Sequence, residues 1–231
     1  DGSDKTKPIT ITVAPDPVRQ LGLVMAMGSV TAVQADSPAA EAKIQPGDRI
    51  VDPNGDPMML PDRLRREAGK TIDVRLVRDS EREPIVAKVQ LREPRGFAQP
   101  VLENSPVAAD ALGAAYRVGN RVERVEAGSP ADKAGMRPGD VLVQAKLNGP
   151  SKEKLRELGV DPSEDLVEAS DGKAEFREKD ANWPSFMTAL QMTLPGTTVE
   201  LTYLRDGEKK TTEPMELVAA ADWNTPARGL R

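Results

Sequence analysis

Histidine and cysteine are both absent from this chain of 231 residues. Their absence excludes a Ser-His-Asp or Cys-His triad, a zinc site of imidazoles or thiolates, an iron–sulfur cluster and any disulfide. A Ser–Lys dyad, or a carboxylate site for a hard cation, is still compatible with the composition. A chain without cysteine can work on either side of a membrane, so the redox compartment stays open.

Aromatic residues and positive charge are also scarce. Aromatics make up 3% of the residues and the net charge is −5, with the excess acidity placed after residue 92. Nucleic-acid binding calls for a basic face and stacking platforms, so it is disfavoured. The longest nearly apolar run, LGLVMAMGSVTAV at 21–33, is shorter than the roughly 20 residues that span a bilayer. We therefore expect a soluble fragment, cut at Asp1 and Arg231 from a longer protein.

A segment of fifteen residues is repeated in the chain and organises it. SPAAEAKIQPGDRIV at 37–51 and SPADKAGMRPGDVLV at 129–143 agree at eight of fifteen positions. In each copy Ser is placed as a helix N-cap and Pro at the first helical position. Past the short helix a left-handed residue is expected, and there the second copy has Gly135 whereas the first has Lys43. Repeats of this length predict two similar folding units.

The residues on either side of this segment are repeated as well. A Leu-Gly pair opens a strand at 21–24 and again at 112–115, and a second strand is expected at 30–33 and at 122–125. Pro-Gly-Asp then turns the chain into a strand that ends in Asn-Gly, at 54–55 and at 148–149, which is a hairpin signal. A second helix is predicted at 62–68 and at 184–193. Further strands are predicted at 9–13, 71–79, 85–91, 198–206 and 215–219.

The boundaries follow from these offsets. We predict a first domain at 1–92, a linker at 93–106, a second domain at 107–220 and a tail at 221–231. The second domain carries a charged insert at about 150–182, which we interpret as a solvated decoration with a short helix between Ser151 and Gly159. The fold class is α+β.

Together these motifs resemble bacterial PDZ domains. Two copies of Leu-Gly, Ser-Pro-Ala, Pro-Gly-Asp and a closing Arg-Asp strand cover nearly the whole chain. The resemblance implies two tandem PDZ domains, each a small, partly open β-barrel or sandwich capped by two helices. The Leu-Gly loop would bind a peptide carboxylate with its backbone N–H groups, and the following strand would pair with the peptide by β-augmentation.

The resemblance also assigns site residues. The carboxylate loops are Leu21, Gly22 and Leu23, and Leu112, Gly113 and Ala114. The groove walls are Val24, Leu60 and Leu64 in the first domain and Ala115, Phe186 and Leu190 in the second. The family's ligand-reading histidine is missing, which implies apolar C-termini as ligands. No residue is assigned to catalysis or to a metal, and it stays open whether each groove binds a free C-terminus.

Tandem PDZ domains are similar to the extramembrane insert of site-2-type zinc metalloproteases, which act in regulated intramembrane proteolysis. That resemblance implies a non-catalytic module that gates trimmed membrane-protein substrates or binds polypeptide C-termini. It further implies a periplasmic place on a bacterial inner membrane, no cofactor in this fragment, and zinc in the parent protein. Two alternatives stay open, namely the PDZ tail of an HtrA-type serine protease and a free-standing PDZ scaffold.

Overall fold

The computed structural model describes residues 17–52, 55–94, 102–157, 159, 161, 171–176 and 182–224. Most of its strands belong to one antiparallel sheet of eleven strands. The strands of the first part of the chain are β1 (Pro17–Gln20), β2 (Leu23–Val33), β3 (Arg49–Ile50), β4 (Thr71–Val77), β5 (Ile85–Gln90), β6 (Val107–Ala109) and β7 (Ala114–Val125). The later strands are β8 (Val141–Asn148), β9 (Gly172–Glu175), β10 (Thr198–Arg205), β11 (Glu208–Thr211), β12 (Met215–Glu216) and β13 (Val218–Asn224).

The helices are short. They are α1 (Pro38–Glu41), the 3-10 helix η1 (Pro57–Met59), α2 (Leu60–Arg66), α3 (Pro130–Lys133), α4 (Lys152–Glu157) and α6 (Trp183–Met192). The side chains of Ser37 and Ser129 cap α1 and α3, accepting from the N–H groups of Ala40 and Asp132. The predicted caps are therefore confirmed, and Pro follows at the first helical position in both helices.

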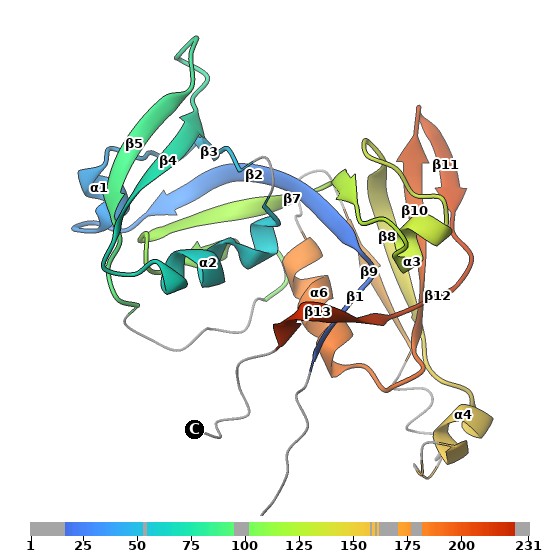
Figure 1. The fold of residues 1–231 in the computed structure, drawn as a ribbon. Coiled ribbons are helices and arrows are strands. Elements are labelled where there is room, and N and C mark those ends of the chain that lie inside the picture. Colours follow the sequence, from blue (N-terminus) through green and yellow to red (C-terminus); the bar gives the residue numbers. More distant parts are fainter. Residues whose placement is uncertain are drawn as a thin grey trace, which may run out of the picture.

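Two long strands cross the whole molecule. β2 and β7 pair antiparallel from Leu23 opposite Val125 to Val33 opposite Ala114. Figure 1 shows both strands running side by side from one end of the fold to the other. Each strand therefore begins among the elements of one repeat and ends among those of the other.

The sequence predicted two strands where each long strand lies, and that prediction is wrong. No break separates 21–24 from 30–33, or 112–115 from 122–125. Glycine at the midpoint permits the continuous path, because a Cβ on Gly28 would lie 2.7 Å from the carbonyl oxygen of Arg117. The β2–β7 register shifts several times along its length. Such shifts are typical of β-bulges, which bend a strand and increase its twist.

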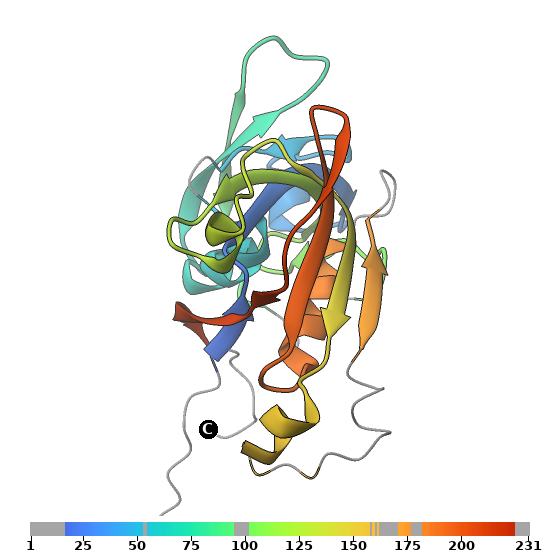
Figure 2. The ribbon, with the colours of Figure 1, turned by 90° about the vertical axis from the view of Figure 1, so that its right-hand side faces the viewer.

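Each long strand thus passes from its own repeat into the other, and we call this the strand exchange. It divides the fold into two lobes. The α2 lobe contains α1, β3, α2, β4 and β5, the second half of β2 and the first half of β7. The α6 lobe contains α3, β8, α6 and β10, the first half of β2 and the second half of β7. In the turned view of Figure 2, α6 lies behind β8 and β10. The domain boundaries expected at 1–92 and 107–220 stay a prediction, and the two regions share one sheet.

A single apolar cluster fills both lobes. It includes Leu76 and Val89 of the α2 lobe, Leu142 and Leu201 of the α6 lobe, and Met25 of the crossing strand β2. Each of these side chains is at most 1% exposed. Burial of apolar area therefore links the lobes rather than stabilising each one separately.

Several other predicted elements can be compared directly. The second helices are present at 60–66 and 183–192, and the insert begins with α4, whose Lys154 N–H is accepted by Ser151 Oγ. The hairpin expected after Asn148 is confirmed in part: β8 ends at Asn148 and pairs antiparallel with the next strand, β9. A tight turn at Asn-Gly is wrong, because α4 follows β8 and β9 starts only at Gly172. The strand expected at 9–13 and the Asn54 turn lie outside the described residues.

Candidate functional site

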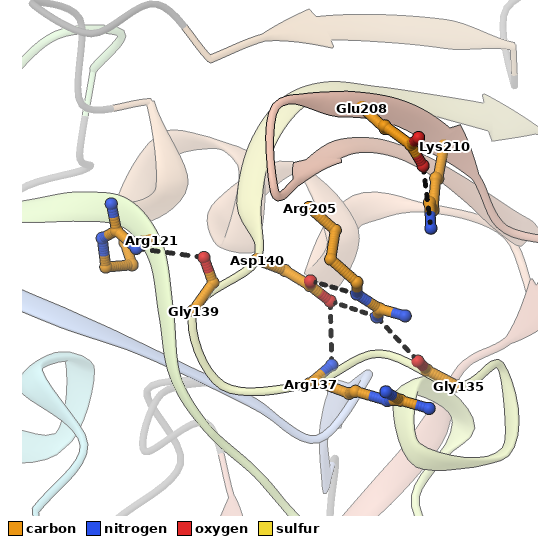
Figure 3. A network of polar contacts seen from close by, with 8 residues as sticks. All are labelled: Arg121, Gly135, Arg137, Gly139, Asp140, Arg205, Glu208 and Lys210. Carbon is orange, nitrogen blue, oxygen red and sulfur yellow. Dashed lines mark hydrogen bonds and ion pairs between the residues drawn. The ribbon is translucent and has the colours of Figure 1, made fainter.

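The Pro-Gly-Asp motif is a structural brace in both repeats. Asp140 is 1% exposed and accepts from Arg205 Nε and Nη2 at 2.7 Å each. The same carboxylate accepts from the Arg137 N–H, and Arg205 also donates to the Gly135 carbonyl at 2.8 Å (Figure 3). The aspartate thus ties the turn after α3 to the end of β10.

The first repeat contains the same brace. Asp48 accepts from Arg78 Nε at 2.7 Å and Nη2 at 2.8 Å, and from the Gln45 N–H. The hydrogen bonds from Arg78 lower the pKa of the Asp48 carboxyl below its ordinary value. Arg78 also donates to the Lys43 carbonyl, as its counterpart does to Gly135. Both carboxylate oxygens of Asp48 and of Asp140 accept hydrogen bonds, so the repeated segment serves the fold, as its sequence indicated.

Each Leu-Gly loop lies against the Ser-Pro-Ala helix of the other repeat. The carbonyl oxygens of Leu112 and Gly113 accept from the N–H groups of Ala39 and Gln34, at 2.9 and 2.8 Å. Symmetrically, the carbonyls of Leu21 and Gly22 accept from Ala131 and Glu126. Glycine is required here by packing, because a Cβ on Gly113 would lie 2.3 Å from Ser37 Cβ, and the Gly113 φ is +77°. Gly22 has the same relation to Ser129, at 2.1 Å.

This exchange changes how the predicted site residues are grouped. Resemblance placed the loop at 21–23 with Leu60 and Leu64, and the loop at 112–114 with Phe186 and Leu190. In the structure, α2 lies against β6 beside the second loop, whereas α6 lies against β1 beside the first. Leu60 and Leu64 therefore share a lobe with Leu112, Gly113, Ala114 and Ala115. Phe186 and Leu190 share the other lobe with Leu21, Gly22, Leu23 and Val24.

In the α2 lobe, the outer edge of β7 is covered by a strand of the chain itself. β6 pairs antiparallel with the start of β7, with Val107 opposite Tyr116 and Ala109 opposite Ala114. Its other side faces α2. Val107 and Ala109 are 6% and 0% exposed, whereas Ala108 is exposed. β6 thus lies between strand and helix with alternate side chains directed inward.

The end of β6 also supplies the acceptor for the N–H groups of the Leu-Gly loop. The N–H groups of Leu112 and Gly113 both donate to the carbonyl oxygen of Ala109, at 3.0 and 2.8 Å. Two converging backbone donors make a small concavity suited to an oxygen with negative charge. In this structure a neutral carbonyl oxygen occupies the position that the resemblance assigns to a peptide carboxylate.

The α6 lobe is closed differently. Here β1 pairs with β13 rather than with β2. The side-chain amide of Gln191 in α6 bonds both backbone groups of Arg19. It accepts from the Arg19 N–H at 2.7 Å and donates to the Arg19 carbonyl at 2.9 Å. The Arg19 guanidinium also donates to the carbonyls of Gln191 and Thr193. This side chain satisfies carbonyl groups at the end of α6.

The predicted groove walls are mostly packed. Val24 and Phe186 are 2% exposed, Leu60 and Leu64 are 6% exposed, and Leu190 is fully buried. Ala115 is half-buried. A hollow of about 340 Å³ lies on the side of α2 that faces β3 and β4, and its apolar lining includes Ile50, Ile72 and Val74. Leu60 and Leu64, the predicted wall residues of α2, also line that hollow, whereas Val24 does not.

A buried polar cluster joins α2 to β7. The Tyr116 hydroxyl donates to the Pro57 carbonyl at 2.6 Å, and burial raises the pKa of this phenol. Asp56, the residue before Pro57, accepts from the Met58 N–H, and burial raises the pKa of the Asp56 carboxyl. These contacts fix the start of α2 against the strand whose edge β6 covers. Sequence reasoning missed Tyr116, because a lone tyrosine in a strand carries no distinguishing signal.

Sequence reasoning also missed β6. Its segment Val107-Ala108-Ala109 has the alternation of a short strand, but it directly precedes a Leu-Gly loop and was placed only inside the second domain. A short apolar segment just upstream of such a loop is the signal that could have identified it. No group of three or more acidic residues among those described could hold a metal ion, and no helix in that part of the chain is long and apolar enough to cross a membrane.

A family model matches part of the chain. The family model of the PDZ domain matches residues 29–67 and 121–145, so a PDZ domain is detected in this chain. No curated protein matches the chain. The two matched segments begin near the midpoints of β2 and β7 and run through α2 and into β8. PDZ domains are in general peptide-binding modules, and nothing catalytic accompanies the match.

Proposed function

We propose that this chain is a non-catalytic peptide-recognition module made of two PDZ units that exchange their long strands. The observation that carries the proposal is the state of the β7 edge. An extended segment pairs antiparallel with Ala114–Tyr116, lies against α2, and places a carbonyl oxygen on the N–H groups of Leu112 and Gly113. A bound peptide with a C-terminal carboxylate would make the same three kinds of contact.

The mechanism is capture by backbone groups. The edge of β7 supplies the hydrogen-bonding ladder, the loop N–H groups receive the carboxylate, and α2 provides an apolar wall. One short strand and one small pocket suggest a dissociation constant of about 1–100 μM, equal to roughly −5.5 to −8 kcal/mol. Apolar C-termini are expected, because the chain has no histidine to read a polar ligand side chain.

Peptide titration tests this function. A fluorescein-labelled peptide with an apolar C-terminal residue is titrated with the protein, and fluorescence polarisation reports binding. Amidation of the same peptide replaces the carboxylate by a neutral group, so we expect about a tenfold or greater loss of affinity from the weakened charge-assisted hydrogen bonds. Equal affinity of the acid and the amide would contradict carboxylate capture and favour gating by bulk alone.

For the parent protein we propose a membrane-embedded site-2-type zinc metalloprotease of regulated intramembrane proteolysis. The tandem repeat and its similarity to the extramembrane insert of that family support this proposal. The module would then stand on the periplasmic face of a bacterial inner membrane and admit substrates already trimmed by another protease. Zinc would belong to the parent's catalytic part, because the described residues here include no ligand group for it.

The flanking reading frame tests the parent. An upstream His-Glu-x-x-His inside an apolar span would support the intramembrane metalloprotease. A trypsin-like segment with Gly-x-Ser-x-Gly would instead support the HtrA-type alternative. If both motifs are absent, the alternative of a PDZ scaffold without an attached enzyme would be supported.

A further inference from the structure

We propose that the peptide site of the α2 lobe is held closed by the chain's own segment Val107–Ala109, and that its ligand is a peptide ending in Val-x-Ala with a free carboxylate. The inference rests on the proposed peptide-recognition function. It adds the occupant of the site, the route by which the site opens and the class of C-terminus that fits.

The three residues of β6 lie along the same edge of β7 that a peptide would use, in the antiparallel direction. Ala109 is the residue whose carbonyl oxygen meets the N–H groups of Leu112 and Gly113. Because those donors are occupied, an incoming carboxylate can reach them only after the segment leaves.

Ala109 is fully buried, so the pocket beside the loop fits a methyl group closely. Val107 is 6% exposed and fills the next inward position, while Ala108 between them is exposed. A ligand with the same inward residues, Val and Ala, would fit without repacking the core, whereas a larger final residue would overpack the pocket.

The segment Val107–Ala109 is a short strand. Its pairing extends over only three residues, whereas β2 and β7 pair along most of their lengths. Upstream, the N–H of Asn104 donates to Asn182 Oδ1 at the start of α6, and Asn182 also donates to Glu103. The segment is thus fixed at its far end to the other lobe. A short strand with these few attachments can open while the two long strands keep the fold intact.

Binding therefore depends on how many molecules have the segment Val107–Ala109 detached from the edge of β7. The apparent affinity for a peptide is the intrinsic affinity multiplied by the fraction of molecules in which the edge of β7 is free. A substitution that weakens β6 without touching the walls should raise that fraction and tighten binding. Val107→Asp meets this requirement, because it places a charge at a buried position of the segment itself. Ala108→Asp is the matched control, since its side chain is exposed on the same strand.

The experiment titrates a labelled peptide ending in Val-Ala-Ala-COOH into the whole chain and these two variants. We expect Val107→Asp to bind about tenfold more tightly than the wild type, and Ala108→Asp to bind like the wild type. If all three proteins bind the peptide equally, self-occupation is overturned while peptide recognition stands. If none of them binds the free acid, the proposed function itself fails at this site.

A reversible lock covers the case in which Val107→Asp does not fold. Ala108 and Ala115 lie opposite each other in the β6–β7 pair, and the chain has no cysteine of its own. The double variant Ala108→Cys and Ala115→Cys can therefore form one disulfide that pins the segment in place. Oxidation should abolish binding of the Val-Ala-Ala-COOH peptide, and a reductant should restore it. Undiminished binding by the oxidised protein would overturn the proposal.

Discussion

Lys43 offers a direct test of how the repeats use their left-handed positions. Its φ is +58°, and the matching residue of the second repeat is Gly135, with φ +77°. A residue with a Cβ loses about 1–2 kcal/mol in this conformation. Glycine also gains about 0.4–1 kcal/mol of entropy in the unfolded chain. Lys43→Gly should therefore stabilise the protein by a net 0.5–1 kcal/mol, roughly.

The exchange can be run in both directions. Gly135→Lys should lose about the same amount, and no atom within 4 Å of its Cβ position would add a clash. The variant with both substitutions should return to within about 0.5 kcal/mol of the wild type, because the sites lie in different lobes. Lys43→Ala keeps the Cβ and removes the rest of an exposed side chain, so it serves as the control for lost side-chain contacts.

Urea unfolding followed by circular dichroism measures these differences as shifts in midpoint at constant slope. Stabilisation by Lys43→Gly but not by Lys43→Ala would confirm backbone strain at this residue. Equal effects of the two substitutions would refute the reasoning, since both would then act through the lysine side chain.

Three further predictions concern the fold. Calorimetry should show one unfolding transition, because a single apolar cluster runs through both lobes, and two separate transitions would contradict that. Asp48→Asn should destabilise the protein at pH 7 but progressively less below the ordinary carboxyl pKa of 3.8. The Asp48 pKa is lowered by folding, so its contribution is present above the unfolded pKa and lost as the pH falls; a difference independent of pH in urea titrations would argue against the brace. Tyr116→Phe should cost about 1 kcal/mol in urea unfolding, because the Pro57 carbonyl keeps its hydrogen bond from Leu60 N–H, and no loss would mean that the Tyr116 bond is not formed.

Local structure was predictable because each motif carries its own physical cause. Ser37 and Ser129 announce helix starts by their cap chemistry, and the position of Lys43 predicted a left-handed residue that the structure contains. Alternating apolar residues at 71–77 and 198–205 identified the closing strands. All of these are decided by residues within a few positions of each other.

Partner choice was not predictable in the same way. The two repeats present nearly the same Ser-Pro-Ala helix, so the pattern around Gly22 fits Ser37 or Ser129 equally well. Only the three-dimensional path shows that Gly22 meets Ser129 and that Gly113 meets Ser37. Gly28-Ser29 lies between Ala26 and Val30 and fits a two-residue hairpin turn, so the local pattern did not show that the chain continues straight. That choice determines which walls and loops share a site.

The most direct test of this account is a peptide titration of the 15N-labelled whole chain, followed by two-dimensional NMR. With the Val-Ala-Ala-COOH peptide, we expect shifts at the amides of Leu112 and Gly113 together with those of Leu60 and Leu64, since one site is built from both repeats. Shifts that join Leu112 and Gly113 to Phe186 and Leu190 instead would contradict the strand exchange and the site that depends on it.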